Sequence, residues 1–346
     1  MGPIAGNTLA RLAGTSIKRR LGARYPYFCS WYVTSKCTTR CEGCVFFERL
    51  RTSGPDLSRV EALGVVDELA GSGLPVLIFV GGEPLLRPDL SELLKRAKRR
   101  GMYTVIFTNG APITPDITRR LSPNLDVMIV SLDGFGHGHD TIRGRGSFAS
   151  AWQGLNTYIS HRAFKKSLVY ANIGLHKGSI NTVPMLVHEL LSSKVDKIKL
   201  QPNFIPSFKP DPKEALLVVD FLENSWVKNP DRFAVDKPYL DRLRTYFERD
   251  DNREYCGAPS LAHIAVLPDG TVSACCDFLL PMGSLREKNL QKILKTDPVR
   301  LREQARHCAG CCRRDYMLVQ DFLDAPLRNL TLSGLTRALK GYVTPA

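Results

Sequence analysis

The chain has 346 residues, of which 43% are hydrophobic, so it is long enough for one large α/β domain or two domains with a sizeable core. Its formal net charge of +14 indicates an anionic partner or a solvated basic surface. Aromatic-glycine strand motifs and zinc-finger histidine spacing are both missing, so nucleic acid is not an expected partner. No stretch reaches the roughly 18 apolar residues of a membrane-spanning helix.

Residues 1–25 form a basic, partly amphipathic segment without the uninterrupted apolar stretch of a signal peptide. We therefore expect a cytoplasmic protein with reduced thiols. Residues 321–346 repeat the basic, amphipathic character. Such segments either lie on an anionic membrane surface, which would give a peripheral contact with the inner membrane, or form ordinary helices that cap a barrel. We favour the second interpretation.

From residue 27 onward, short β-branched runs alternate with amphipathic segments of helical length, which is the pattern of βαβ units. The strands are nearly continuously apolar, so we expect a parallel sheet covered by helices. Six units predict a partial (β/α)6 TIM-like barrel or an open doubly wound sheet, and the pattern alone does not separate the two. The predicted strands are 27–34, 75–80, 103–108, 126–132, 168–175 and 196–202.

Two predicted helices carry local start signals. A capping box from Ser58 to Glu61 opens the first helix, and Pro88 and Asp89 suit the first turn of the second. These signals agree with the hydrophobic period, which supports the alternation of strands and helices.

The chemistry of a parallel α/β fold lies at the carboxyl ends of its strands, so the residues that follow each strand are candidate site residues. Polar, glycine or cysteine residues follow four consecutive strands and describe a shared cavity. These residues are Cys37, Cys41 and Cys44 after the first strand, Gly81, Gly82 and Glu83 after the second, Asn109 after the third, and Ser131 and Asp133 after the fourth.

Beyond about residue 205 the alternation stops at a proline-rich boundary. We expect a domain boundary there. A helical connection over 206–255 is followed by a cysteine-rich auxiliary-cluster part over 256–320. Within that part, residues 262–276 predict a β-hairpin around the Pro-Asp-Gly turn at 268–270. The predicted core domain is therefore 26–205, with basic segments 1–25 and 321–346 at the two ends.

The cysteines indicate metal binding, because a chain of this length needs no disulfide framework. Cys37, Cys41 and Cys44 have the spacing C-x3-C-x2-C within one loop. Three thiolates leave one iron of a four-iron cluster without a protein ligand, whereas a structural zinc site would need a fourth ligand. Cys29, inside the first strand, is most simply a buried apolar thiol.

This loop, followed in order by "GGEPLLRPDL", "FTNG" and "SLDG", resembles the radical S-adenosylmethionine (SAM) superfamily. The resemblance implies a [4Fe-4S] cluster on the three cysteines, SAM bound at the open iron, and Glu83 accepting hydrogen bonds from the SAM ammonium. Gly81 and Gly82 would let a backbone edge approach the ligand closely. Asn109 would line the cofactor pocket.

The same resemblance extends to later residues. It places Ser131 and Asp133 at the ribose or the methionyl end, Arg143 at the carboxylate, and Gln201 within reach of the adenine. One departure is visible, because relatives usually carry an aromatic residue just before the last cysteine, where this chain has Gly43. Phe46 or Phe47 would have to replace that aromatic.

The second group of cysteines is similar to the SPASM and Twitch extensions of the same superfamily. Cys256, Gly270 and Cys275 have the spacing of the opening hairpin, and Cys308 and Cys311 supply a second pair. Only one further cysteine follows this pair, so the Twitch form with one auxiliary [4Fe-4S] cluster is expected. A four-cysteine zinc site is the alternative, and Cys276 or Cys312 could replace a neighbouring ligand.

The expected function is therefore reductive cleavage of SAM to a 5′-deoxyadenosyl radical that abstracts hydrogen from a substrate. The expected partners are a flavodoxin- or ferredoxin-like reductant and a small-molecule or lipid substrate, which is favoured over a peptide. The alternative is a non-catalytic iron-sulfur or zinc protein for electron transfer or scaffolding. No catalytic acid, base or radical relay is assigned.

Overall fold

The computed structural model of the protein describes residues 6–44, 54–163, 167–203, 205–249, 260–275, 280–297, 299–301 and 303. Its strands form one nine-stranded sheet in the order β6-β5-β4-β3-β2-β1-β7-β8-β9. The strands from β6 to β7 in this order are parallel to their neighbours, whereas β8 and β9 are antiparallel.

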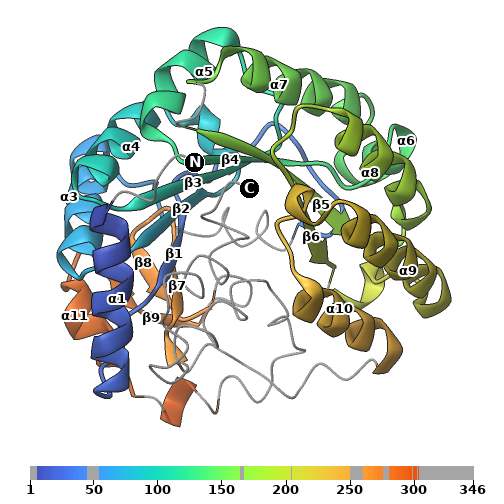
Figure 1. The fold of residues 1–346 in the computed structure, drawn as a ribbon. Helices are drawn as coiled ribbons and strands as arrows, with labels where there is room; N and C mark the ends of the chain where they lie inside the picture. The colour runs from blue at the N-terminus through green and yellow to red at the C-terminus, as the bar shows by residue number, and fades with distance from the viewer. Residues whose placement is uncertain are drawn as a thin grey trace.

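All six predicted strands are confirmed, and each lies within two residues of its expected bounds. They are β1 (Phe28–Tyr32), β2 (Val76–Val80), β3 (Tyr103–Thr108), β4 (Val127–Ser131), β5 (Leu168–Leu175) and β6 (Lys197–Pro202). The sheet curves, and the helices cover its convex face (Figure 1). The predicted partial barrel is therefore correct, and the open doubly wound alternative is wrong.

The helices begin where local chemistry favours a start. The Ser58 hydroxyl and the Glu61 carboxylate form the predicted capping box of α3. The next helix starts at Leu90, and Asp89 does not cap it but pairs with Arg87 at 2.8 Å. The α-helices are α1 (Gly6–Arg20), α3 (Arg59–Gly71), α4 (Leu90–Arg99), α5 (Pro115–Leu121), α6 (His137–Arg143), α7 (Ser147–His161), α8 (Val183–Ser192), α9 (Pro212–Lys228), α10 (Lys237–Arg249) and α11 (Leu290–Ile293).

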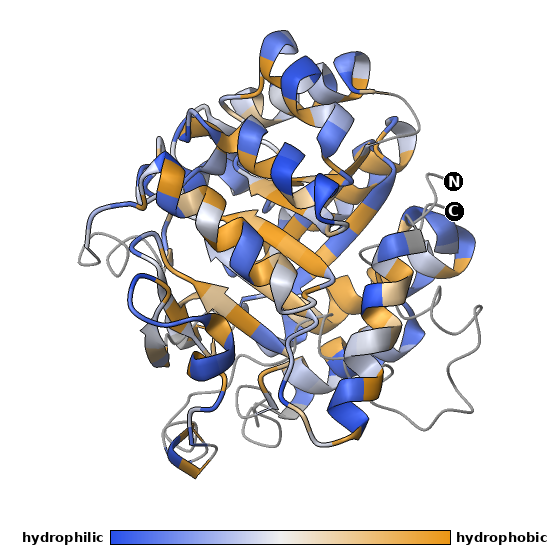
Figure 2. Ribbon diagram, turned by 90° about the vertical axis from the view of Figure 1, so that its left-hand side faces the viewer, coloured by the Kyte–Doolittle hydropathy of each residue, from blue (hydrophilic) through white to orange (hydrophobic). Residues whose placement is uncertain are grey.

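Side chains alternate between the two faces of the sheet. On β1, Cys29 and Trp31 point outward into the layer of helices, and Phe28 points into the barrel. Cys29 is fully buried, as predicted, and this burial raises the pKa of its thiol. Figure 2 shows mainly hydrophobic strands beneath helices that carry hydrophilic outer stripes. Hydrophobic burial on both faces thus holds the sheet in place.

Helix α1 lies across the amino ends of the strands. Leu12 is fully buried in the interior cluster that contains Phe28. The Arg11 guanidinium donates to the carbonyl of Ala70 at 2.8 Å, and the Thr8 hydroxyl donates to that of Gly101 at 3.2 Å. The barrel-capping interpretation of this segment is therefore correct. The second amphipathic segment, 321–346, lies outside the described residues.

The helices that follow residue 205 lie beside the barrel sheet. Backbone N–H of Ala234 donates to Ile198 O at 2.8 Å, and the Tyr239 hydroxyl donates to Leu200 O at 2.8 Å, so α9 and α10 flank β6 and continue the outer layer. Among the helices of the described residues, none is long and apolar enough to cross a membrane.

The predicted hairpin is confirmed as β7 (His263–Val266) and β8 (Thr271–Ser273), and β9 (Pro281–Ser284) follows. Strand β7 pairs in parallel with β1, so the hairpin extends the barrel sheet. Strands from the sequence before and after the expected domain boundary at residue 256 therefore belong to one sheet.

Candidate functional site

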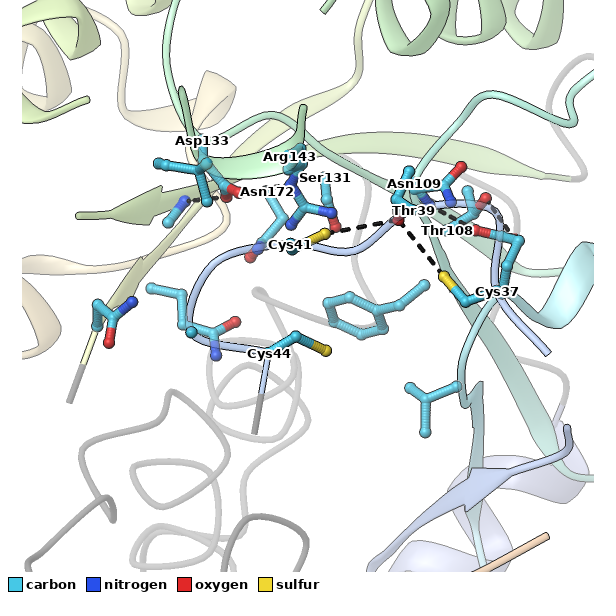
Figure 3. Close-up of a pocket in the computed structure, with 18 of the residues that line it drawn as sticks. Cys37, Thr39, Cys41, Cys44, Thr108, Asn109, Ser131, Asp133, Arg143 and Asn172 are labelled. Carbon is cyan, nitrogen blue, oxygen red and sulfur yellow. Dashed lines mark hydrogen bonds and ion pairs between the residues drawn. The ribbon is translucent and has the colours of Figure 1, made fainter. Parts of the chain in front are cut away.

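A cavity of about 320 Å³ opens at the carboxyl ends of the barrel strands. It is lined by the three cysteines of the first loop and by every residue predicted to bind the cofactor. Figure 3 labels the three cysteines together with Asn109, Ser131, Asp133 and Arg143. These residues come from six segments that are distant in sequence. The residues brought together are Cys37, Cys41, Cys44, Gly81, Gly82, Glu83, Asn109, Ser131, Asp133, Arg143 and Gln201.

The cysteine loop runs along the rim of this cavity. The sulfur atoms of Cys37 and Cys41 lie 3.4 and 3.5 Å from the hydroxyl of Thr39, which lies between them. Cys44 is exposed at the end of the loop. Within the described part of the chain, no three His, Cys, Asp or Glu side chains are grouped closely enough to hold a single metal ion.

Gly81 and Gly82 line the cavity and also pack tightly against the backbone of the cysteine loop. A Cβ on Gly82 would lie 2.2 Å from Lys36 O, and one on Gly81 would lie 2.7 Å from Thr34 O. Gly81 also has a φ of +143°, which favours glycine. Backbone N–H of Gly82 donates to Thr34 O at 2.9 Å. The backbone that approaches these glycines closely is thus the cysteine loop itself.

Glu83 is the buried carboxylate of the site, with 1% of its surface exposed. Its Oε1 accepts hydrogen bonds from the Thr108 hydroxyl at 2.8 Å and from Leu85 N at 3.1 Å, and its Oε2 accepts one from Asn109 N at 2.8 Å. Burial raises the pKa of Glu83, and these hydrogen bonds oppose that rise. A carboxylate has about four acceptor positions, so one remains for a cationic ligand.

Asn109 connects the end of β3 to the cysteine loop. Its Nδ2 donates to the Thr38 hydroxyl at 3.2 Å, and its Oδ1 accepts from Ala111 N at 2.9 Å. Both ends of the side-chain amide are therefore occupied. Asn109 lines the pocket as predicted, and its structural effect is to fix the loop against β3.

Asp133 and Arg143 form a buried ion pair beside the cysteine loop. The Arg143 Nε donates to Asp133 Oδ2 at 2.5 Å, and Gly174 N donates to Asp133 Oδ1 at 3.1 Å. Burial raises the pKa of Asp133, but the charge and hydrogen bond of Arg143, with smaller effects from His139 and Gly174, together outweigh it, so the net pKa is lowered. Burial lowers the pKa of Arg143, but the charges of Asp133, Cys41 and Cys44 outweigh it, so the net pKa is raised.

His139 contacts the backbone of this ion pair at Asp133. Its Nδ1 accepts a hydrogen bond from Asp133 N at 3.1 Å, so the neutral ring carries its proton on Nε2. Burial lowers the pKa of His139 to about 4. A neutral imidazole at this position accepts from, and so helps to fix, the backbone of Asp133.

Phe208 packs against Gly43, the position at which relatives usually carry an aromatic residue. Gly43 has a φ of +70°, and a Cβ there would lie 2.7 Å from Cδ2 of Phe208. The Phe208 ring also stacks on His176, with 5.1 Å between ring centroids. An aromatic ring thus stands beside the last cysteine, although it comes from a different part of the chain. Phe46 and Phe47 lie outside the described residues.

Sequence reasoning missed several polar cavity residues inside the barrel, among them Ser30, Asn172, Lys199 and His263. The Ser30 hydroxyl and His263 Nε2 lie 2.8 Å apart on β1 and β7. Asn172 lies on the inner face of β5, and Lys199 lies opposite it on β6. The available signal was polar residues at alternating positions of otherwise apolar strands, because such residues face one side together.

Of the predicted auxiliary ligands, the structure describes only Cys275, which is half-buried directly after β8. The Ser273 hydroxyl donates to the carbonyl of Cys275 at 2.9 Å. The other predicted or alternative ligands lie outside the described residues: Cys256, Cys276, Cys308, Cys311 and Cys312.

The donor set of the cavity fits a cluster with SAM. Three cysteines supply thiolates, which suit iron-sulfur clusters. The buried Glu83 has an acceptor position for an ammonium, and Arg143 has Nη donors for a carboxylate beyond the Nε that Asp133 occupies. A zwitterionic methionyl group would therefore meet a complementary charge at each end.

Comparison with known proteins also indicates iron-sulfur and SAM chemistry. Residues 31–183 match the model of the radical SAM superfamily, and residues 256–313 match that of the SPASM iron-sulfur cluster-binding domain. A radical SAM domain implies a [4Fe-4S] cluster and SAM, and an SPASM domain implies auxiliary iron-sulfur clusters.

Several curated proteins are similar to parts of the chain. The Fe-coproporphyrin III synthase of Methanosarcina barkeri is 32% identical over 170 residues, which are 49% of this chain and 42% of that protein. An AdoMet-dependent heme synthase of the same organism is 34% identical over 38% of either chain. Mycofactocin maturase MftC of Mycobacterium tuberculosis is 35% identical over 39% of this chain and 34% of its own. The chain thus matches less than half the length of each.

Solved structures share the fold. SuiB of Streptococcus suis bound to S-adenosylmethionine aligns with a TM-score of 0.64 and 16% identity, over 86% of this chain and 70% of SuiB. The anSMEcpe structure with bound AdoMet aligns with a TM-score of 0.65 and 15% identity, over 91% of this chain and 95% of that chain. These solved structures show the shared fold, and the two domain matches show that the chain carries a radical SAM domain and an SPASM iron-sulfur cluster-binding domain.

Proposed function

We propose that the protein is a radical SAM enzyme that reductively cleaves SAM to a 5′-deoxyadenosyl radical, which abstracts hydrogen from a substrate. The observation that carries this proposal is the meeting of three loop cysteines, Glu83 and Arg143 in one cavity. When bound, the cluster supplies one electron to the sulfonium of SAM.

The side chains of this cavity would orient SAM. Burial raises the pKa of Glu83, and an ammonium placed at its remaining acceptor position would offset the unfavourable burial of its charge. The Nη groups of Arg143 are donors of the planar kind that carboxylates accept in pairs. Asp133 fixes the guanidinium through Nε, so the arginine is held in place before the ligand arrives. Ser131, at the end of β4, is proposed as a contact of the ribose or the methionyl end.

We further propose that Cys256, Cys275, Cys308 and Cys311 bind one auxiliary [4Fe-4S] cluster. The match of residues 256–313 to the SPASM domain supports iron-sulfur chemistry over zinc in this region. Cys275 follows the hairpin that pairs with β1, so the auxiliary cluster would lie in a part of the chain joined to the barrel sheet. Cys276 and Cys312 are the alternatives for a neighbouring ligand.

A small molecule or lipid is the proposed class of substrate. The names of the similar proteins support it in part, since they include heme synthases and a nucleotide dehydratase. A peptide is the competing class, because the relatives also include mycofactocin maturase and SuiB was solved with the precursor peptide SuiA. A flavodoxin- or ferredoxin-like protein is the proposed reductant.

A peripheral contact with an anionic membrane is proposed only for the end of α1. Ile17 and Leu21 are exposed there beside Lys18, Arg19 and Arg20, whereas Leu12 is fully buried in the barrel interior. Flotation of the protein with liposomes that do or do not contain anionic lipid tests this contact. Equal absence from both lipid fractions would refute it.

Anaerobic reconstitution followed by reduction in the presence of SAM tests the proposed function. The protein should release 5′-deoxyadenosine and methionine, Cys37→Ala should abolish this release, and Cys308→Ala should retain some of it. Cys29→Ala is the matched control, because this buried thiol lies on the outer face of β1. Protein that contains zinc and no iron, or that contains iron but does not cleave SAM, would favour the non-catalytic alternative.

A further inference from the structure

One wall of the cavity carries several polar side chains inside the barrel. It is formed by the inner faces of β5 and β6, where Asn172 lies directly opposite Lys199 and Gly174 lies opposite Gln201. His176 continues this inner face just beyond the end of β5. Below this level, side chains such as Ile129 and Tyr170 fill the barrel interior. The polar side chains of β5 and β6 therefore lie at the level of the cavity, above the apolar interior.

Two side chains of this wall have polar atoms without a partner among the described residues. They are Oδ1 of Asn172 and Nε2 of His176, and the two residues are only 6% and 3% exposed. Nδ1 of His176 accepts from Gly178 N at 2.9 Å, so the neutral ring carries its proton on Nε2 and offers a donor. Buried polar groups are normally hydrogen-bonded, so a ligand with polar atoms is expected against this wall.

Lys199 gives the wall a positive charge. Its side chain lines the cavity although the residue is only 2% exposed. An ammonium has three N–H donors, so a contact within the protein leaves donors for a ligand. Among the other charged groups of the cavity wall, Glu83 accepts from Thr108, Leu85 and Asn109, Asp133 pairs with Arg143, and Glu42 is exposed.

We propose that Asn172, His176 and Lys199 form a subsite for an anionic group of the substrate, a carboxylate or a phosphate. Lys199 supplies the charge and His176 donates Nε2–H to the same group. A half-turn of the Asn172 amide exchanges Oδ1 for Nδ2, which provides a further donor. This inference rests on the proposed function, because it places the substrate beside the SAM site, and it narrows the substrate to molecules that carry an acid group.

Calorimetric titration of the reconstituted, SAM-bound protein tests the subsite. The two probes are inorganic pyrophosphate and succinate, each at an ionic strength held constant with NaCl. The variants are Lys199→Met, Lys199→Arg and His176→Phe, and the control is Lys213→Met, whose lysine is exposed on α9. The SAM-induced change in the spectrum of the reduced cluster reports for each variant whether the SAM site is intact.

Saturable binding of at least one probe is expected for the wild type. Lys199→Met should weaken it about tenfold or more, whereas Lys199→Arg and the control should stay within about threefold. Pyrophosphate alone would identify a phosphorylated substrate, and succinate alone a carboxylic acid. His176→Phe, which keeps the ring on Phe208, should weaken binding to a smaller extent, and it decides the question if Lys199→Met does not fold.

Three results would overturn the subsite. They are no saturable binding of either probe, binding unchanged by Lys199→Met, or a loss of the SAM-induced spectral change in Lys199→Met, which would make Lys199 a SAM contact. Failure of the proposed function has a different signature. In that case Lys199 would still control probe binding, but the wild type would not cleave SAM.

Discussion

Substitution of Gly82 by alanine should displace the cysteine loop. The added Cβ would lie 2.2 Å from Lys36 O, 2.6 Å from Lys36 C and 3.0 Å from Ser35 O. All three are backbone atoms, so the overlap cannot be relieved by a rotation of a side chain. The hydrogen bonds from Gly82 N to Thr34 O and from Glu83 N to Lys36 O would be strained together. Overpacking and two weakened hydrogen bonds should lower the free energy of unfolding by roughly 2–5 kcal/mol.

The assay combines denaturant unfolding with iron analysis after anaerobic reconstitution. Gly82→Ala should lose about four irons per chain, which correspond to one cluster, and should not cleave SAM. Gly64→Ala is the matched control, because a Cβ on Gly64 in α3 meets nothing within 4 Å. This control should stabilise the protein by about 0.5–1 kcal/mol, because alanine is a better helix former than glycine.

The contact between the two loops would be refuted by a Gly82→Ala protein that keeps its iron, its stability and its SAM cleavage. Equal losses in Gly82→Ala and Gly64→Ala would also contradict the reasoning. Such a result would show a general sensitivity to the added methyl group.

Three further substitutions or conditions test the surroundings of the site. Asp133→Asn should cost about 3–5 kcal/mol in denaturant unfolding, because it leaves Arg143 buried without its charge partner; wild-type stability would contradict this. Gly43→Ala should weaken SAM binding, since it combines an unfavourable φ with a collision against Phe208, and Phe208→Ala in the same chain should restore part of it. Burial lowers the pKa of His139 to about 4, so its stabilising effect is present above about pH 6.5 and is lost as the pH falls toward 4. Unfolding at pH 5 should therefore show roughly 2 kcal/mol less stability than at pH 7, and His139→Asn should reduce that difference.

The barrel and the cofactor side of the site could be predicted because they follow local rules. Near-continuous apolar runs located the six strands, and parallel strands place their carboxyl ends at one edge. Residues at or after those ends, from Cys37 to Asp133, consequently meet in one cavity, whereas Arg143 was expected there only from the resemblance to the superfamily. Their order along the chain was enough, and no knowledge of side-chain contacts was needed.

Contacts between distant segments could not be read in the same way. The glycines were expected to let a backbone edge approach a ligand, but the contact of Gly82 with the backbone of Lys36, which lies 46 residues earlier, was not foreseen. The aromatic ring beside Gly43 comes from Phe208, and only the folded chain brings the two together. Lys199 also escaped notice, because a lysine within a strand usually faces solvent. Here the strand is part of a barrel, and its inner face carries the charge into the cavity.

The central claim is that one iron of the cysteine-loop cluster lacks a protein ligand and binds SAM. Electron paramagnetic resonance of the reduced cluster in the Cys308→Ala protein, in which the auxiliary cluster should be disrupted, tests this claim most directly. The account predicts that addition of SAM shifts the spectrum of the remaining cluster, and that Cys37→Ala removes that signal. A spectrum that is unchanged by saturating SAM would contradict the account.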